Sequence, residues 1–116
     1  MSYSVNLYDL ATGKTVYVEK HTEGGTICAG GDGKARMSIT YNYSWFYYKF
    51  LHAEGLYHLN GKKASDVDGL LRKAIDVLGT RTHADYWADT PGNAGKALEI
   101  LMKWGEQYPD AFWSVR

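Results

Sequence analysis

A chain of 116 residues with 45% hydrophobic and 22% charged residues has the composition of one globular domain and is too short for two. Thirteen basic and thirteen acidic residues give a formal net charge of zero. This argues against general binding to nucleic acids or membrane surfaces, because such binding relies on an excess of Lys and Arg. Cys28 is the single cysteine, so an intrachain disulfide and a cysteine-rich zinc site are both excluded.

The start of the chain and its apolar runs predict a cytoplasmic protein. The opening residues 1–4 lack the basic start and the apolar run of a signal peptide. No stretch approaches the ~18 consecutive apolar residues of a membrane span. A single cysteine also fits a reducing compartment. We therefore expect a protein of the cell cytoplasm that makes no membrane contact.

The first third of the chain carries the pattern of strands. Tyr3, Val5 and Leu7 alternate with polar neighbours, as in a half-buried strand. β-Branched and aromatic residues follow a turn and predict the returning strand of a hairpin. A glycine-rich stretch then separates two further short apolar runs. The predicted strands, two to four in number and spread over about residues 3–41, lie at 3–9, 15–19, 26–28 and 35–41.

The middle of the chain carries the pattern of two helices. Residues 43–53 contain no helix breaker and are dense in aromatic side chains. An apolar stripe at helical spacing then runs to Leu78. Ser65 or Asp66 is the expected cap of this second helix, and Gly79 is the residue expected just past its end. The sequence therefore predicts helices over about 43–53 and 66–78.

Thr90 and Pro91 open a third helix as its N-cap and first residue, and Pro109 stops it, which predicts a helix over about 91–107. The apolar tail at 111–115 suits a final strand. Strands followed by helices predict an α+β fold, with a small antiparallel N-terminal sheet packed with three helices. We expect residues 1–116 to form a single domain.

The spacing of chemically active residues argues against three kinds of site. Residues 33–35 lack the spacing of a phosphate-binding loop, and no helix is evident after them. His52 and His58, with Glu54 between them, are six residues apart and lack the i, i+4 spacing of two histidine ligands on one helix face, so we expect no metal and no cofactor. Cys28 has no adjacent positive charge and is expected to be inert. Without a recognisable nucleophile–base pair, we expect no enzyme.

Aromatic residues make up 15% of the chain and are concentrated in one stretch. This stretch contains Tyr41, Tyr43, Trp45, Phe46, Tyr47 and Tyr48. On one helix these rings cannot all face the core, so some of them should be exposed or line a cleft. Exposed rings can stack on bases, sugars or the side chains of a partner. For any single ring, dense packing in the core is the alternative.

Two predicted helix starts share the features of an anion site. Residues 40–43 lead into the first helix and residues 90–93 begin the last, and each start carries an Asn amide with aromatic rings close by. Helix N-termini present N–H groups and a partial positive charge. If the two starts meet, they form a pocket for a nucleotide-like ligand; ordinary capping is the alternative. The predicted ligand-binding residues are Asn42, Tyr43, Trp87, Thr90, Asn93 and Arg81, with Lys62 or Lys63 as further phosphate partners.

Three short motifs resemble a group of small phage and prophage proteins of unknown function. They are Ile39-Thr40-Tyr41-Asn42-Tyr43, Tyr86-Trp87-x-x-Thr90-Pro91-x-Asn93-Ala94 and Tyr108-Pro109-Asp110-Ala111-Phe112-Trp113. The resemblance covers most of the chain from Gly24 onward. It implies a phage setting and brings no catalytic residues with it. Small phage proteins without enzyme motifs often act on the host by stoichiometric binding.

We therefore expect a non-enzymatic binding protein, a phage accessory protein that antagonises a host antiviral defence. It would sequester a nucleotide-like signal at the paired helix starts or mask a host protein with its aromatic surface. Two alternatives stay open. One is a small nucleotide-processing enzyme, and the other is a structural or regulatory protein that acts by self-assembly as a homo-oligomer.

Overall fold

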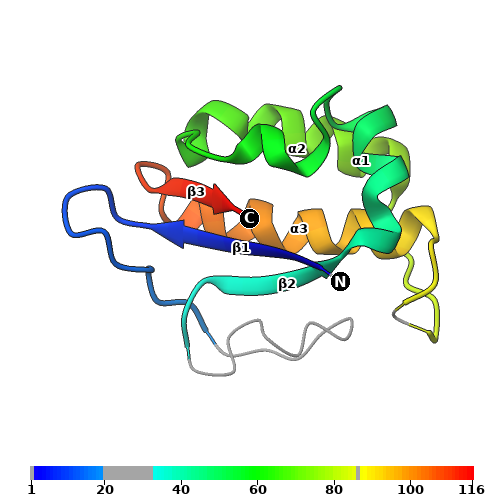
Figure 1. The fold of residues 1–116 in the computed structure, drawn as a ribbon, viewed down its shortest axis with the longest axis horizontal. Coiled ribbons are helices and arrows are strands. Elements are labelled where there is room, and N and C mark those ends of the chain that lie inside the picture. Colours follow the sequence, from blue (N-terminus) through cyan, green and yellow to red (C-terminus); the bar gives the residue numbers. More distant parts are fainter. Residues whose placement is uncertain (1, 20–32, 86) are drawn as a thin grey trace.

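The computed structural model describes residues 2–19, 33–85 and 87–116. In these residues the chain forms an α+β fold, as the sequence predicts (Figure 1). Its elements in chain order are strand β1 (Ser2–Tyr8), strand β2 (Arg36–Thr40), 3-10 turn η2 (Tyr41–Tyr43), helix α1 (Ser44–Phe50), 3-10 turn η3 (Gly55–Leu59), helix α2 (Ala64–Leu78), helix α3 (Pro91–Gln107) and strand β3 (Phe112–Val115).

The described strands form an antiparallel three-stranded sheet in the order β2-β1-β3. Tyr3 in β1 lies opposite Ile39 in β2, and Leu7 lies opposite Trp113 in β3. Alternate residues of β1, among them Val5, point into the core, which confirms the predicted half-buried strand. The expected C-terminal strand completes the sheet at the edge opposite β2, so the sheet joins both ends of the described chain.

The predicted hairpin after β1 is only partly formed. Thr15 makes a single bridge to Tyr8, and Tyr17 makes a single bridge to Lys34. The returning segment therefore meets its neighbours at separate points and does not run along them as a continuous strand. The strand predicted at residues 26–28, with its cysteine, lies outside the described residues.

Helix α3 begins and ends where the sequence predicts, at Pro91–Gln107. Thr90 is its N-cap, and the Thr90 hydroxyl accepts the backbone N–H of Asn93 at 3.2 Å. Helix α2 ends at Leu78, and Gly79 follows it with a φ of 75°. Because this left-handed conformation strains most residues other than glycine, Gly79 ends α2 in the predicted way.

The predicted cap of α2 is wrong: the helix begins at Ala64, before Ser65 and Asp66. The residue preceding Ala64 makes no side-chain capping bond. Backbone carbonyls satisfy the first N–H groups instead, since Ala64 donates to Ala111 at 2.8 Å and Ser65 donates to Pro109 at 3.0 Å. The start of α2 is thus set by the segment that leads into β3, which no local sequence pattern reveals.

The first predicted helix is longer than the observed one. Instead of a helix over 43–53, η2 leads into α1 (Ser44–Phe50), and the chain then turns into η3, which the sequence analysis did not predict. Gly55 has a φ of 64° at this turn. A Cβ atom on Gly55 would lie 2.9 Å from Cε1 of Tyr48, so the Tyr48 ring packs directly on the glycine backbone. This contact fixes the turn that ends the first helical region.

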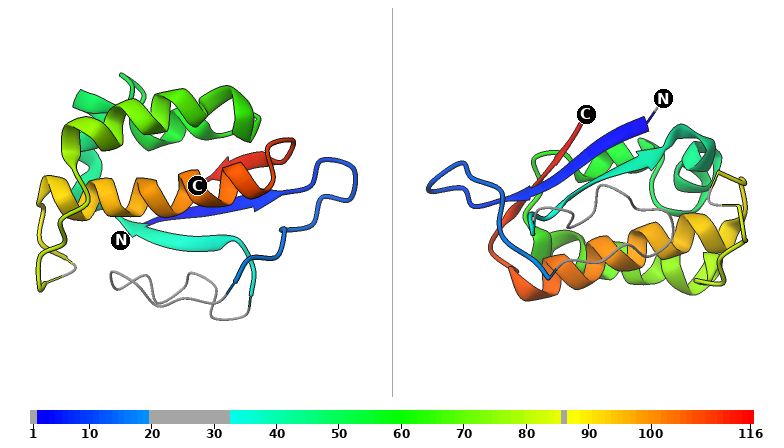
Figure 2. Two further views of the ribbon diagram at one scale, coloured as in Figure 1. Left: turned by 180° about the vertical axis from the view of Figure 1, so that it is seen from behind. Right: turned by 90° about the horizontal axis from the view of Figure 1, so that it is seen from below.

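The described helices lie on one side of the sheet. Figure 2 shows α2 and α3 packed side by side there, and they contact each other along their length. Helix α1 lies at one end of the molecule and the turn after β1 lies at the opposite end (Figures 1 and 2). The buried core between these layers includes the aromatic rings of Tyr3, Tyr43, Tyr47 and Trp113.

Two glycines let α3 press its backbone against the segment that follows α2. A Cβ atom on Gly92 would lie 1.8 Å from the carbonyl oxygen of Arg81. A Cβ atom on Gly95 would lie 1.8 Å from the carbonyl oxygen of Gly79. No side chain fits at either position, so residues 79–81 lie directly on the first two turns of α3.

We expect Gly95→Ala to lower the free energy of unfolding by about 3 kcal/mol or more, because the added methyl group meets backbone that must move. The matched control is Gly69→Ala in α2, where an added Cβ meets nothing within 4 Å. This control should raise stability by about 0.5–1 kcal/mol, since alanine favours the helix. Urea denaturation measures both, and changes of the same sign would contradict the close contact at Gly95.

Candidate functional site

The two helix starts that the sequence singles out lie next to each other. The Nδ2 group of Asn42, in η2, donates to the backbone oxygen of Trp87 at 2.8 Å, in the loop before α3. Below this contact, the buried hydroxyl of Tyr47 in α1 donates to the backbone oxygen of Ala94 in α3 at 3.0 Å. The chain entering α1 and the chain entering α3 therefore meet through direct hydrogen bonds.

Asn93 uses its side chain inside the protein. Its residue surface is only 5% exposed. Its Oδ1 atom accepts the backbone N–H of His83 at 2.9 Å, and its Nδ2 atom donates to the carbonyl oxygens of Asp85 and Ala88, each at 3.0 Å. One amide on α3 thus holds three points of the preceding loop, and its polar atoms are engaged within the chain.

The other predicted ligand-binding residues divide by exposure. Tyr43 is buried in the core, whereas Asn42, Trp87 and Arg81 are exposed. Thr90 is half-buried and caps α3. At the first start, the Thr40 hydroxyl likewise accepts the backbone N–H of Asn42 at 3.2 Å. Ordinary helix capping, the alternative to an anion site, therefore accounts for the hydroxyl groups of Thr40 and Thr90.

The two lysines suggested as phosphate partners lie at the start of α2. Lys63 pairs with Asp110, the Nζ–Oδ1 distance being 3.2 Å. Lys63 also forms a β-bridge to Phe112. Lys62 donates its backbone N–H to the Leu59 carbonyl at 3.0 Å. The structure thus ties these residues to β3 and η3, and no described bond joins them to the helix starts.

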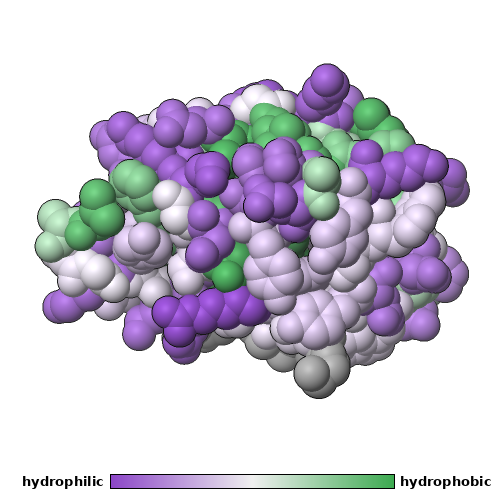
Figure 3. All heavy atoms as spheres, turned by 45° about the horizontal axis from the view of Figure 1, so that its top comes forward, coloured by the Kyte–Doolittle hydropathy of each residue, from purple (hydrophilic) through white to green (hydrophobic). Residues whose placement is uncertain are grey.

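Exposed aromatic rings gather around α1. Tyr41, Trp45 and Tyr48 follow the i, i+4, i+7 spacing of one helix side, and Tyr57 joins them from η3. Their exposed fractions are 37%, 59%, 49% and 43% in that order. We call these four residues the aromatic face. Figure 3 shows pale side chains of intermediate hydropathy, the colour of Tyr and Trp, lying side by side on the surface.

The buried ring of Tyr3 packs against two rings of the aromatic face. The ring of Tyr3 meets the ring of Tyr41 edge-on with centroids 4.7 Å apart, and meets the ring of Tyr57 at 5.1 Å. Its hydroxyl shares a 2.6 Å hydrogen bond with the Ser44 hydroxyl. Burial raises the pKa of Tyr3, and the hydrogen bond with Tyr41 raises the pKa of Tyr57. These phenols therefore stay neutral at physiological pH and offer hydrogen bonds without charge.

Trp45 is held on the helix surface by its neighbours. Its ring lies edge-on to Phe46 and Phe50, with centroid distances of 5.1 and 6.2 Å. The ammonium group of Lys49 lies 4.8 Å from its ring centroid, within the range of a cation–π contact. Such contacts restrict the ring before any partner arrives, which lowers the entropic cost of binding.

The aromatic run in the sequence indicates part of this surface. Some rings of residues 41–48 are exposed, as expected, whereas Tyr43 and Tyr47 point into the core. Tyr57 was missed because it lies in η3, a turn that the sequence analysis did not predict. Only the turn at Gly55 brings it back beside α1.

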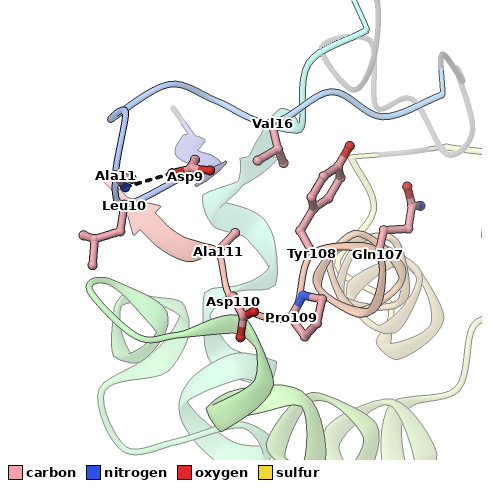
Figure 4. A pocket seen from close by; sticks show the side chains of 9 residues that line it. All are labelled: Asp9, Leu10, Ala11, Val16, Gln107, Tyr108, Pro109, Asp110 and Ala111. Carbon is pink, nitrogen blue, oxygen red and sulfur yellow. Dashed lines mark hydrogen bonds between the residues drawn. The ribbon is translucent and has the colours of Figure 1, made fainter.

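A hollow of about 580 Å³ lies away from these residues, between the turn after β1 and the end of α3. Figure 4 shows its lining: Asp9, Leu10, Ala11, Val16, Gln107, Tyr108, Pro109, Asp110 and Ala111. Both of its carboxylates are engaged, since Asp9 accepts the N–H of Ala11 at 2.8 Å and Asp110 pairs with Lys63. Tyr108 donates its hydroxyl to the Tyr17 carbonyl. No predicted ligand-binding residue lines this hollow, and its carboxylates serve the fold.

The turn at Gly55 also brings His52, Glu54 and His58 together, with potential ligand atoms that all lie within 4.8 Å of one another. The sequence argument against a metal used the spacing of ligands on one helix. That rule does not apply here, because His52 follows α1 whereas His58 lies in η3. These three side chains are therefore candidates for holding a metal.

No family model, curated protein or solved structure matches this chain. Within residues 2–19, 33–85 and 87–116, every helix falls short of the length and apolar character that crossing a membrane requires. A functional assignment for this chain therefore depends on its own side chains.

We expect Asn93→Ala to lower the free energy of unfolding by about 1–3 kcal/mol, because it leaves three partly buried backbone groups of the loop without their partner. The backbone amide of His83, which bonds to Asn93, should exchange its hydrogen faster. Asn42→Ala is the comparison, since its exposed bond to Trp87 should be worth less than about 1 kcal/mol. Thermal unfolding and amide exchange measure these effects. If the His83 amide exchanges its hydrogen as slowly in Asn93→Ala as in the parent chain, the side chain of Asn93 does not hold the loop in place.

Proposed function

We propose that this chain is a non-enzymatic binding protein that holds a protein partner against its aromatic face. The observation that carries this proposal is the set of large exposed rings around α1, two of which, Tyr41 and Tyr57, meet the buried ring of Tyr3 edge-on. Tyrosine and tryptophan combine a large apolar body with a polar tip, and they are enriched at the energetic centres of protein interfaces. A face of this kind suits a partner that covers it and bonds to its hydroxyls.

The polar residues near the helix starts support a protein partner over a nucleotide-like one. The amide of Asn93 is engaged by the loop, and Tyr43 lies in the core. The hydroxyls of Thr40 and Thr90 accept backbone N–H groups of their own segments. These groups serve the fold, whereas the rings of the aromatic face are open to solvent.

The resemblance to small phage proteins supports a specific kind of partner. In a phage setting, the partner is a host protein of antiviral defence, and this chain masks it stoichiometrically. A nucleotide-like signal is the second candidate ligand. The bond between Asn42 and Trp87 favours it, because it joins the exposed Asn42 to the backbone of a residue whose own indole ring is exposed.

The test uses affinity capture from a bacterial lysate to identify a partner, followed by calorimetry with the purified partner. We expect a one-to-one complex whose dissociation constant rises at least about tenfold in Trp45→Ala and in Tyr57→Ser, as for residues at the centre of an interface. The matched control is Leu10→Ser, which removes a similarly exposed apolar side chain from the turn after β1. This turn lies at the end of the molecule opposite α1 (Figure 1).

Three outcomes would count against the proposal. One is an equal loss of affinity in Leu10→Ser, and another is full affinity in both aromatic variants. The third is heat of binding with a panel of linear and cyclic nucleotides that disappears in Trp87→Ala, which would favour the second candidate. Recovery of chemically altered nucleotide from the same mixture would point to an enzyme.

A further inference from the structure

A sharp turn after α1 brings the imidazoles of His52 and His58 close to the carboxylate of Glu54. The backbone N–H of Gly55 donates to the carbonyl of His52 at 2.8 Å and closes the turn. Gly55 adopts a φ of 64° there, and the ring of Tyr48 packs against it. His52 and His58 therefore approach each other across the turn although six positions separate them.

The three side chains already contact one another. The Oε1 atom of Glu54 lies 2.9 Å from Nδ1 of His58 and 3.7 Å from Nδ1 of His52. The two imidazole rings are stacked, with centroids 3.6 Å apart and planes 11° from parallel. The hydrogen bond with His58 is the main cause that lowers the pKa of Glu54. A carboxylate anion thus faces two imidazoles at neutral pH.

We propose that His52, Glu54 and His58 bind a divalent transition metal ion such as Zn²⁺. Two imidazole nitrogens and one carboxylate oxygen are ligands that zinc and its neighbours in the first transition series accept. Bonds of about 2.0 Å in a tetrahedral site place the donor atoms about 3.3 Å apart. The distances of 2.9 and 3.7 Å from Glu54 lie on either side of this value. Because an imidazole binds a metal in the plane of its ring, one of the two stacked rings must turn out of the stack to direct its nitrogen at the ion.

Metal binding replaces two hydrogen bonds. The ion takes the place of the Nδ1 proton that His58 donates to Glu54, and this proton moves through water to Nε2 of His58. The ion also takes the Nδ1 lone pair with which His52 accepts the backbone N–H of Glu54 at 3.0 Å. Because Ala53 and Glu54 are exposed, water can solvate the released N–H group of Glu54. With three protein ligands, one coordination position is left for water or for a group of a partner.

The test is a titration of the full chain with Zn²⁺ after treatment with EDTA. We expect one site by calorimetry and, in histidine ring spectra by NMR, shifts confined to His52 and His58. The affinity should fall at least about tenfold in His58→Ala and in Glu54→Gln, as expected when the ligand set of a metal site is damaged. Glu54→Gln keeps the size of the side chain, so it preserves the turn while removing the charge.

The matched control is His83→Ala, which removes a histidine whose Nδ1 accepts the backbone N–H of Asp85 in the loop before α3. This variant should bind Zn²⁺ as the parent chain does. The proposal is overturned if millimolar Zn²⁺ shifts neither the His52 nor the His58 ring signals, or if His83→Ala abolishes binding. The ring signals of the unaltered chain give this answer even where a variant fails to fold.

Discussion

Direct contact between the start of α3 and the segment after α2 determines where the loop before α3 lies. At Gly92 and Gly95 the backbone of α3 meets carbonyl oxygens with no side chain between them. Such close approach lets Cα–H groups face carbonyl oxygens, a weak attraction that recurs where backbones touch. The chain that leaves α2 at Gly79 therefore runs along α3, and the described loop residues 83–85 and 87–88 lead back to Thr90.

This constraint explains why one asparagine controls the loop. Asn93 lies between the two contact glycines in sequence, so its side chain is buried where the loop passes. A buried amide is stabilising only if its donor and acceptor groups are bonded, and the loop backbone supplies those bonds. The loop in turn brings the carbonyl of Trp87 to Asn42, which connects α3 to the start of the aromatic region.

The regular elements were predictable because their signals are local. The stripe of α2, the cap and proline of α3 and the alternation of β1 depend on spacing alone, and the structure contains them all. The start of α2 was not predictable, since carbonyls from the far end of the chain satisfy its first N–H groups. The spacing of apolar residues within a helix carries no information about a hydrogen-bond partner that is more than forty residues away in the sequence.

The residues of the candidate site also fall into two groups, those that a local sequence pattern identifies and those that depend on distant contacts. The sequence analysis raised the meeting of the two helix starts as a condition, on their Asn amides and nearby rings, and the bond between Asn42 and Trp87 meets that condition. It could not show that the amide of Asn93 is directed to the loop, since a buried clamp and a ligand-binding amide have the same local pattern. It also set His52 and His58 aside, because the rule of helical spacing does not describe a turn with a positive φ at Gly55.

The turn at Gly55 links the two proposals physically. The ring of Tyr48 belongs to the aromatic face, and it also packs on the glycine that brings His52 to His58. A partner that moves Tyr48 therefore acts on the geometry of the metal ligands, and a metal that tightens the turn acts on the position of Tyr48. Linkage requires these effects to be reciprocal: the factor by which metal changes partner affinity equals the factor by which partner changes metal affinity.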